Sequence, residues 1–288
     1  MRKGRAYLLV FPACLFTLFV LVYPLGQNLF NSFHKVTMMR DSGWIGLANY
    51  AAVMKDPLFW LALKNSLSYA AVGTIVSMVV GLLVAMLLNQ RLGRWRNLFK
   101  FIYMIPWVVS PVVAGFAWKW LLNDQFGMIN HLLVRLGVIS TGILWLGQAE
   151  TALLSVMIAR VWQFFPFAMI MFFAALQNIP QEQYEAAEVD GAGASAKFKH
   201  ITIPNLKSVT VVLLLLGLIW SFNDFNLVYI MTHGGPIHAS MVLPVLVREY
   251  SFVMYDLGKG SALSVVIFLV LLLLSSVYLY LLAKRERL

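Results

Sequence analysis

Six apolar stretches, each long enough to cross a lipid bilayer, constrain this sequence more than any other feature. An α-helix rises 1.5 Å per residue, so about 20 apolar residues cross a hydrocarbon core of about 30 Å. The stretches lie near residues 7–30, 66–89, 99–122, 152–177, 209–231 and 261–283. The composition, 61% hydrophobic and 12% charged, lies far from that of a soluble globular domain. We therefore predict an all-α, polytopic membrane protein with six transmembrane helices.

The first stretch follows Met-Arg-Lys-Gly-Arg, a basic beginning that is also typical of signal peptides. It is too long for the apolar part of a signal peptide and shows no clear small-residue cleavage site, so we interpret it as a retained membrane anchor. No internal repeat is obvious, and no low-complexity linker divides the chain. We predict a single transmembrane domain over residues 1–288.

The distribution of basic residues predicts the orientation in the membrane. The net charge of +10 could indicate nucleic-acid binding, but the basic residues form short clusters beside apolar stretches, without interleaved aromatic residues. Outside the stretches or at their ends, thirteen Lys and Arg residues, with Lys100 among them, fall on the side of both chain ends and seven on the other side. The positive-inside rule therefore places both termini and residues 178–208 in the cytoplasm. The outer connection after the first stretch holds Trp44, Tyr50 and Trp60, which suit the headgroup level, so we expect an interfacial helix there.

A polar segment, EAAEVDGAGASAKFKHITIP over residues 185–204, separates the fourth and fifth stretches. Pro180 suits a first helical turn, and nothing breaks a helix before Gly191, which then ends it. Ser195 can cap a second short helix, and Pro204 marks the approach to the fifth stretch. The acidic residues available to a basic partner are Glu182, Glu185 and Glu188. The pattern predicts a cytoplasmic helix-turn-helix, and a solvated loop that only links two spans is the alternative.

Polar residues inside the fourth and fifth stretches indicate where a solute could pass, because such residues are costly in lipid and usually face a protein interior or a water-filled cavity. One stripe of the fifth stretch combines a small residue, an indole, a hydroxyl and a carboxylate at helical spacing. These residues are Gly217, Trp220, Ser221 and Asp224. In the fourth stretch Gln163 and Phe167 share a face, and Pro166 frees a backbone carbonyl. Aromatic rings with few hydrogen-bonding groups suit a neutral sugar, although the same residues could simply pack helices together.

Arg160 and Asp224 are predicted to lie at similar depth in the membrane. Each is seven or eight residues from the outer boundary of its stretch, which corresponds to about 10 to 12 Å. A carboxylate at bilayer depth costs roughly 2.5 to 3.5 kcal/mol, so a cation at matched depth favours an intramembrane ion pair. The alternative is that each side chain faces an aqueous cavity independently.

The polar segment resembles the EAA loop of permease subunits of ATP-binding cassette importers, through EAA at 185–187, Gly191, Ile201 and Pro204. The usual pattern ends Ile-x-Leu-Pro, and Ile203 here replaces the leucine without changing the spacing. Further motifs are similar to the carbohydrate-importing branch, in particular to the first permease of maltose and glycerol-phosphate importers. These motifs are GLANY at 46–50, DPLFW at 56–60, KNS at 64–66, IPWVVSPVV at 105–113 and THGGP at 232–236.

The resemblance implies that residues 178–208 form a coupling loop that docks in a cleft of a separate ATPase. The residues it assigns to coupling are Glu185, Ala186, Ala187, Asp190, Gly191, Ile201 and Pro204. Positions that line the sugar path in the maltose-type permease fall on Gln163, Phe164, Phe167, Gly217, Trp220, Ser221 and Asp224. The residue types differ from that relative at most of these positions, so the location transfers better than the ligand.

The resemblance also implies a multi-pass permease in the inner membrane of a prokaryote, translocating a sugar or polyol without being an enzyme itself. Its implied partners are a second, similar permease subunit, two copies of an ABC ATPase, an extracytoplasmic solute-binding protein and membrane lipid, with no nucleic acid. No cofactor is expected on this chain, and ATP and Mg are expected on the ATPase.

Other functional classes lack their signatures. The only Gly-Lys dipeptide, Gly258-Lys259, has Val253 in place of the first glycine of a phosphate-binding loop. Neither His-Glu-x-x-His nor Gly-x-Ser-x-Gly occurs, a single Cys14 cannot form an intramolecular disulfide, and the five histidines lack metal-ligand spacing. Two alternatives stay open: an ion-coupled secondary transporter, for which Asp224 is the one favourable residue, and a membrane-embedded enzyme supported only by isolated Glu and His residues.

Overall fold

The computed structural model describes residues 11–90, 93 and 95–285, with side chains described as far as residue 276. Residues 7–10 of the first predicted stretch, and several of the basic residues that flank the stretches, lie outside this part. Backbone contacts divide the chain into two compact units, one made of Met1–Trp60 with Leu243–Leu288 and the other of Leu61–Val242. The single transmembrane domain over residues 1–288 stays a prediction.

Long apolar helices dominate the described part of the chain, as predicted. Five segments are long and apolar enough to span a membrane: Phe11–Ser32, Pro57–Leu88, Ala149–Gln177, Ala194–Phe222 and Leu257–Ser276. A sixth span requires α5 (Trp95–Val108) and α6 (Pro111–Leu121) together, and these two helices are bent by 95°. The span predicted near 99–122 is therefore found as a bent pair of helices and not as one continuous helix. Ser110 is extended because it precedes Pro111, which cannot continue the helical hydrogen bonds.

The first unit contains a small β-hairpin, so the all-α prediction needs correction to mostly helical. Strands β1 (His34–Thr37) and β2 (Arg40–Trp44) pair antiparallel. Met38 and Met39 form the turn with positive φ angles of 49° and 61°, a conformation that Asn and Gly adopt more readily. No usual turn residue therefore signals the hairpin in the sequence.

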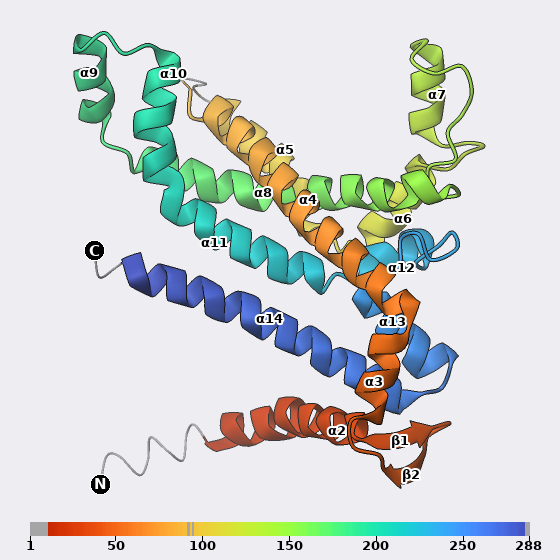
Figure 1. The fold of residues 1–288 in the computed structure, drawn as a ribbon. Helices are drawn as coiled ribbons and strands as arrows, with labels where there is room; N and C mark the ends of the chain where they lie inside the picture. The colour runs from red at the N-terminus through yellow and green to blue at the C-terminus, as the bar shows by residue number, and fades with distance from the viewer. Residues whose placement is uncertain (1–10, 91–92, 94, 286–288) are drawn as a thin grey trace, which may run out of the picture. The chain divides into compact units, whose positions relative to one another are not determined.

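The other elements of the first unit are helical. They are η1 (Leu18–Val22), α2 (Tyr23–Ser32), α3 (Ala48–Lys55), α13 (Leu243–Arg248), η3 (Glu249–Val253) and α14 (Leu257–Arg285), where η marks a π-helix. Helices α2 and α14 run side by side (Figure 1). The Asn49 side chain in α3 donates hydrogen bonds of 2.9 Å to the carbonyls of Ser32 and His34, which fixes α3 against the hairpin. A helix thus occupies the connection after the first span, and its place at the outer membrane surface stays a prediction.

A polar cluster at the start of α14 holds the first unit together. The Asp56 carboxylate accepts hydrogen bonds of 2.7 Å from both the Lys259 ammonium and the Tyr250 hydroxyl. Burial raises the pKa of the Asp56 carboxyl, but these hydrogen bonds, one from the Leu58 amide and the Lys259 charge outweigh burial and bring the pKa below its ordinary value. Asp56 is therefore ionised and paired at neutral pH.

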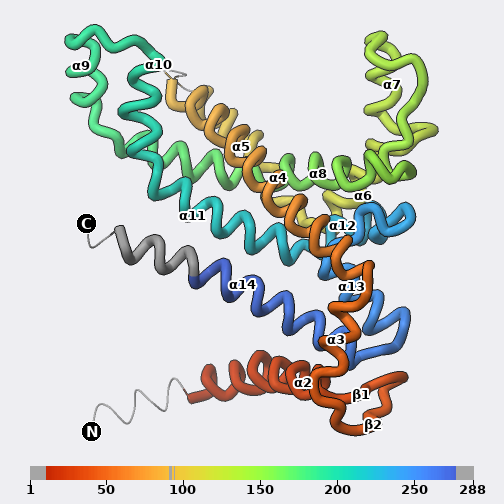
Figure 2. Tube along the Cα trace, viewed as in Figure 1, coloured from red at the N-terminus to blue at the C-terminus, as the bar shows by residue number. Residues whose placement is uncertain are grey.

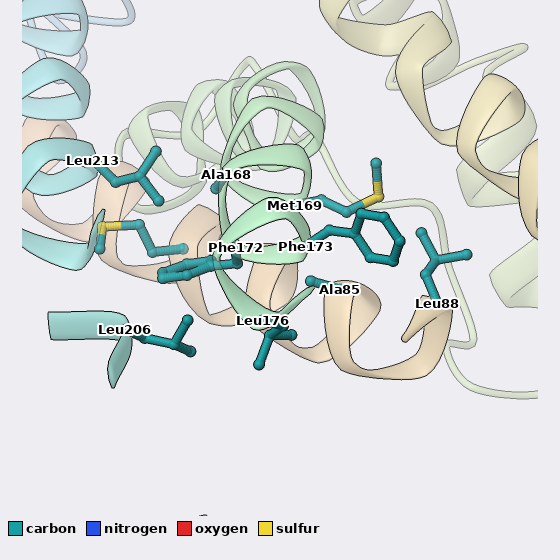
Figure 3. Close-up of a cluster of buried hydrophobic side chains, with 10 residues drawn as sticks. Ala85, Leu88, Ala168, Met169, Phe172, Phe173, Leu176, Leu206 and Leu213 are labelled. Atoms are coloured by element: carbon teal, nitrogen blue, oxygen red, sulfur yellow. The ribbon is translucent and has the colours of Figure 1, made fainter. Parts of the chain in front are cut away.

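The core of the second unit lies between α4 (Pro57–Leu88), α8 (Ala149–Gln177) and α11 (Ile203–Phe222). Figure 3 shows side chains of α8, among them Phe172 and Leu176, between the residues contributed by α4 and α11. Gly81 permits the close approach of α4 to α8, because a Cβ at this position would lie 2.7 Å from the Ala168 Cβ.

The remaining helices of the second unit are α7 (Met128–Arg135), α9 (Gln181–Val189), α10 (Ala194–Lys197), the π-helix η2 (Phe198–Thr202) and α12 (Asn226–Thr232). Figure 2 shows α9 and α10 at one end of α8 and α7 and α12 at the other. The polar segment is therefore separated by the length of α8 from the connection that carries α7.

The fifth span differs from the predicted stretch 209–231 at both ends. Its helix begins at Ala194 and runs through η2 into α11, so the second short helix predicted in the polar segment is continuous with the span. Gly193, and not Ser195, is the N-cap residue, and Pro204 lies in the first turn of α11, where its missing N–H is tolerated after the wider π-helical turn. At the other end α11 stops at Phe222.

Candidate functional site

The candidate solute path begins with one face of α8. Arg160, Gln163, Phe164 and Phe167 follow helical spacing, and the first three are buried. The Gln163 amide nitrogen donates a 3.3 Å hydrogen bond to the Val109 carbonyl at the α5–α6 bend. Within the described part of the chain, the buried Oε1 of Gln163 and Nη2 of Arg160 have no hydrogen-bond partner. Two unsatisfied polar atoms therefore lie on neighbouring turns of α8.

An aromatic group connects α8 to α11. The Trp220 ring lies 5.2 Å from the Phe167 ring and 6.0 Å from the Phe164 ring, measured between centroids. Trp107 of α5 stacks on Phe167 at 5.6 Å. Trp220 is 41% exposed and Trp107 43%, whereas Phe164 is only 2% exposed, so the two indoles are the accessible rings of this group.

Gly217 lies at a helix contact and does not line an open path. A Cβ at this position would collide with the Thr74 side chain of α4 and would lie 3.0 Å from the Phe164 ring. The glycine therefore allows α4, α8 and α11 to meet at one point. Thr74 Oγ1 also lies 3.4 Å from Ser221 Oγ, at the limit of a hydrogen bond.

The structure brings Arg160 and Asp224 together. Nη1 of Arg160 lies 3.9 Å from Oδ2 of Asp224, and the two side chains are 10% and 8% exposed. Asp224 also accepts hydrogen bonds from the Tyr69 hydroxyl at 2.8 Å and from the Leu227 amide at 3.3 Å. Arg160 donates from Nε to Ser221 Oγ at 3.1 Å. Sequence reasoning missed Tyr69, although a hydroxyl inside the predicted stretch 66–89 was a usable signal.

Asp224 lies in a break between two helices and not inside a continuous span. The sequence-based explanation, a carboxylate within a span that is tolerated because of a cation at matched depth, therefore needs correction. Helix α11 ends at Phe222, and α12 begins at Asn226. The Asp224 carboxylate accepts the Leu227 amide, a local bond that competes with helical pairing. The carboxylate is therefore satisfied by a backbone amide, a tyrosine and a nearby arginine.

The polar segment forms an exposed helical hairpin at the far end of α8. Helix α9 ends at Val189, and Gly191 makes the turn with a φ of +78° that L side chains rarely adopt. Of the residues assigned to coupling, Glu185, Ala186, Asp190, Gly191 and Pro204 are exposed, and Ala187 and Ile201 are half-buried. The neighbouring Val189 is 89% exposed, an apolar surface residue that sequence reasoning missed.

Polar contacts hold α9 against the start of the fifth span. The Tyr184 hydroxyl lies 3.0 Å from the Thr202 hydroxyl, and the Asn205 amide donates to Gln183 at 3.1 Å. The Lys197 ammonium donates to the Glu188 carboxylate at 2.6 Å. Glu188 is thus already paired within the chain, and of the three glutamates the exposed Glu182 and Glu185 are the ones that a basic partner can meet.

A cavity of about 420 Å³ with a mixed polar and apolar lining lies at the opposite end of the second unit. Its lining includes Lys119, Asn123, Asp124 and Trp145, together with Thr232, His233, Gly235 and Pro236 of the 232–236 motif. Among the residues that the structure describes, no group of three or more His, Cys, Asp or Glu side chains could hold a metal ion.

Comparison with known proteins adds family information. Residues 77–287 match the family described as binding-protein-dependent transport system inner membrane component. The chain is 35% identical to the probable ABC transporter permease protein YurN of Bacillus subtilis, with 95% of this chain and 94% of YurN covered. It is 34% identical to the trehalose/maltose transport system permease protein MalF of Thermococcus litoralis, with 95% and 92% covered.

The fold also matches a solved structure. A chain from a bacterial ABC transporter involved in the import of the acidic polysaccharide alginate superposes with a TM-score of 0.80, covering 96% of both chains at 21% identity. A second structure of the alginate transporter, in complex with an alginate pentasaccharide-bound periplasmic protein, gives a TM-score of 0.82 at 20% identity and covers 96% of this chain and 93% of that chain. At these identities the likeness concerns the fold alone.

Proposed function

Because this chain belongs to the family of binding-protein-dependent transport system inner membrane components, we propose that it carries a sugar or related polyol across the inner membrane. It is the permease subunit of an ATP-binding cassette importer, a multi-pass membrane component and not an enzyme, and ATP hydrolysis resides on a separate subunit. The alternative of an ion-coupled secondary transporter is therefore wrong, and Asp224 needs no coupled ion to account for its presence.

The observation that carries the carbohydrate proposal is the exposed Trp220 indole, which contacts Phe164 and Phe167 on the face of α8 that also carries two buried polar atoms without a partner in the described residues, Arg160 Nη2 and Gln163 Oε1. A sugar presents apolar C–H faces that stack on an aromatic ring and hydroxyls that both donate and accept hydrogen bonds. A hydroxyl can accept from Nη2 and another can donate to Oε1. The name of the Thermococcus relative, which refers to trehalose and maltose, supports the same class of solute.

The polar segment 178–208 is the coupling element of the proposal, with its exposed hairpin in the cytoplasm, the side of the membrane to which the positive-inside rule also assigns both chain ends. Glu185 meets a basic residue of the ATPase. Ala186 and Gly191 have little or no side chain, which lets the cleft of the ATPase approach the backbone of the hairpin closely. ATP and Mg bind to that ATPase and not to this chain. The full importer contains a second, similar permease, two ATPase copies and an external solute-binding protein, in membrane lipid.

The coupling role is tested by a matched pair of glycine substitutions. Gly191 has a φ of +78° and Gly193 a φ of −69°, and a Cβ at either position would meet nothing within 4 Å. Gly191→Val should distort the hairpin, at a backbone cost of about 1 to 2 kcal/mol, and should lower recovery of the ATPase with the purified permease. Gly193→Val should leave that recovery unchanged. If both variants recover the ATPase and transport solute as well as the wild type does, the hairpin is not part of the docking surface.

The solute class is tested on the cognate solute-binding protein. The ligand that remains bound after purification is released by denaturation and identified by mass spectrometry. A mono- or oligosaccharide or a polyol is expected. An amino acid, a peptide or a metal ion as the bound ligand would overturn the carbohydrate proposal and leave the family assignment intact.

A further inference from the structure

A second, open groove of about 720 Å³ lies along α4 and α11 in the second unit. The two helices meet where Gly217 contacts Thr74, and the groove begins one turn beyond that contact and continues toward Pro204. Phe172 of α8 forms its floor. The groove is distinct from the candidate solute path, because Trp220 and Asp224 do not line it.

The lining is apolar except at one end. Ile75 and Val79 of α4 are each 53% exposed, and Leu214 of α11 is 38% exposed, so the groove presents hydrocarbon to its surroundings. Lys207 lies at the end near Pro204, and no carboxylate lines the groove. Across the described ranges, no hydrogen bond or ion pair involves the Lys207 ammonium, which is therefore available to an anion.

The length of the groove matches one leaflet of a bilayer. From Ile203 to Leu214 it follows α11 for about 16 Å at 1.5 Å per residue, roughly half of a 30 Å hydrocarbon core. The basic residue stands at the end where a headgroup would lie. A second transmembrane helix would need no cation at that position, whereas a phospholipid needs both a hydrocarbon groove and a charge at headgroup depth.

We infer that this groove binds one acyl chain of an anionic phospholipid of the cytoplasmic leaflet, with the Lys207 ammonium at the headgroup phosphate. The choice of leaflet rests on the proposed cytoplasmic location of residues 178–208. Basic groups between transmembrane helices on the cytoplasmic side recognise anionic headgroups, and the cytoplasmic leaflet carries such lipids. The lipid braces the beginning of α11, which continues directly from the coupling hairpin, against α4.

The test uses the assembled importer in nanodiscs that contain equal amounts of phosphatidylglycerol and phosphatidylethanolamine with the same acyl chains. Retained lipids are counted by native mass spectrometry after gentle removal from the disc. Wild-type complex should retain phosphatidylglycerol in preference to phosphatidylethanolamine. Lys207→Gln should lower that preference about fivefold, the ratio that corresponds to about 1 kcal/mol for one lysine at the membrane surface. Lys199→Gln, at another exposed lysine that does not line the groove, is the control and should retain the wild-type preference.

A second pair of variants tests the apolar part of the groove independently of charge. Val79→Phe fills the groove and should lower retention of both phospholipids, whereas Val76→Phe, on an exposed position of α4 outside the lining, should not. Equal phosphatidylglycerol preference in Lys207→Gln and its control would overturn the headgroup contact. A disulfide or cross-link from Leu214→Cys to another polypeptide segment in the assembled importer would show that protein covers the groove, and would overturn the lipid. If the wild-type importer retains phosphatidylglycerol as expected but shows no ATP-driven carbohydrate uptake, that result would contradict only the proposed function.

Discussion

Arg160→Ala and Asp224→Ala should each destabilise the protein strongly, and the double substitution should destabilise it by much less than the sum of the two. The charged groups lie 3.9 Å apart and their side chains are only 10% and 8% exposed. Removing either partner leaves the other as an uncompensated charge inside the protein, whereas removing both leaves no buried charge at the site.

The size of the effect follows from the geometry. The attraction between unit charges at 3.9 Å is about 4 kcal/mol at an effective dielectric constant of about 20. The distance exceeds that of a hydrogen bond, so we expect a measured coupling energy of about 2 to 3 kcal/mol. Asp224→Ala should cost more than Arg160→Ala. The Asp224→Ala substitution leaves Arg160 with one hydrogen bond, to Ser221. The Arg160→Ala substitution leaves Asp224 with hydrogen bonds from both Tyr69 and Leu227.

The assay is the free energy of unfolding in mixed detergent micelles, titrated with sodium dodecyl sulfate, for the wild type, both single variants and the double variant. ATP-driven uptake is measured on the same four proteins after reconstitution. Losses that add within about 0.5 kcal/mol would show that the two side chains act independently. The two charged groups would then be close together without stabilising each other, and Asp224 would be better explained as a residue that contacts the solute directly.

Three further outcomes are expected. Trp220→Ala should lower solute uptake and leave the basal ATPase rate of the complex intact. An unchanged solute preference in this variant would show that the solute does not stack on Trp220. Glu185→Lys should lower recovery of the ATPase by several-fold, whereas Glu150→Lys, exposed at the opposite end of α8, should not; equal recovery would refute a charge contact at the hairpin. The pKa of Asp56 is held below its ordinary value of 3.8, so its stabilising pair with Lys259 is complete above that pH and is lost as the pH falls through the lower folded-state pKa. Asp56→Asn should flatten that acid dependence of the unfolding free energy, and an unchanged slope would contradict the assignment.

The long helices could be predicted because hydrocarbon thickness sets their length and twenty apolar residues leave few other conformations. Gly191 was equally predictable, since a helix followed by a residue with positive φ favours glycine. The bend after α5 had a signal in Pro111, because the residue before a proline avoids the helical region. Each of these features depends on local chemistry alone.

The features that sequence reasoning missed depend on contacts between distant segments. The hairpin lacks turn residues, and it is held in the first unit by β1, whose Thr37 pairs with Asp256, and by the Met38 amide, which donates to the Tyr255 carbonyl at 2.8 Å. The break at Asp224 has neither glycine nor proline to signal it, and its stability comes from a tyrosine of α4. Helical spacing placed Gly217 on the polar stripe correctly but could not show that Thr74 fills the space in front of it.

The most direct test of the central claim is uptake of a labelled carbohydrate, identified as the ligand of the cognate binding protein, by proteoliposomes that contain this chain with its partner permease and ATPase. Uptake is measured with ATP inside or outside the liposomes, with and without the binding protein, and after collapse of the proton gradient. The account predicts uptake that requires the binding protein and ATP on the ATPase side and that continues without a proton gradient. Uptake by this chain alone, driven by a proton gradient and indifferent to ATP, would contradict it.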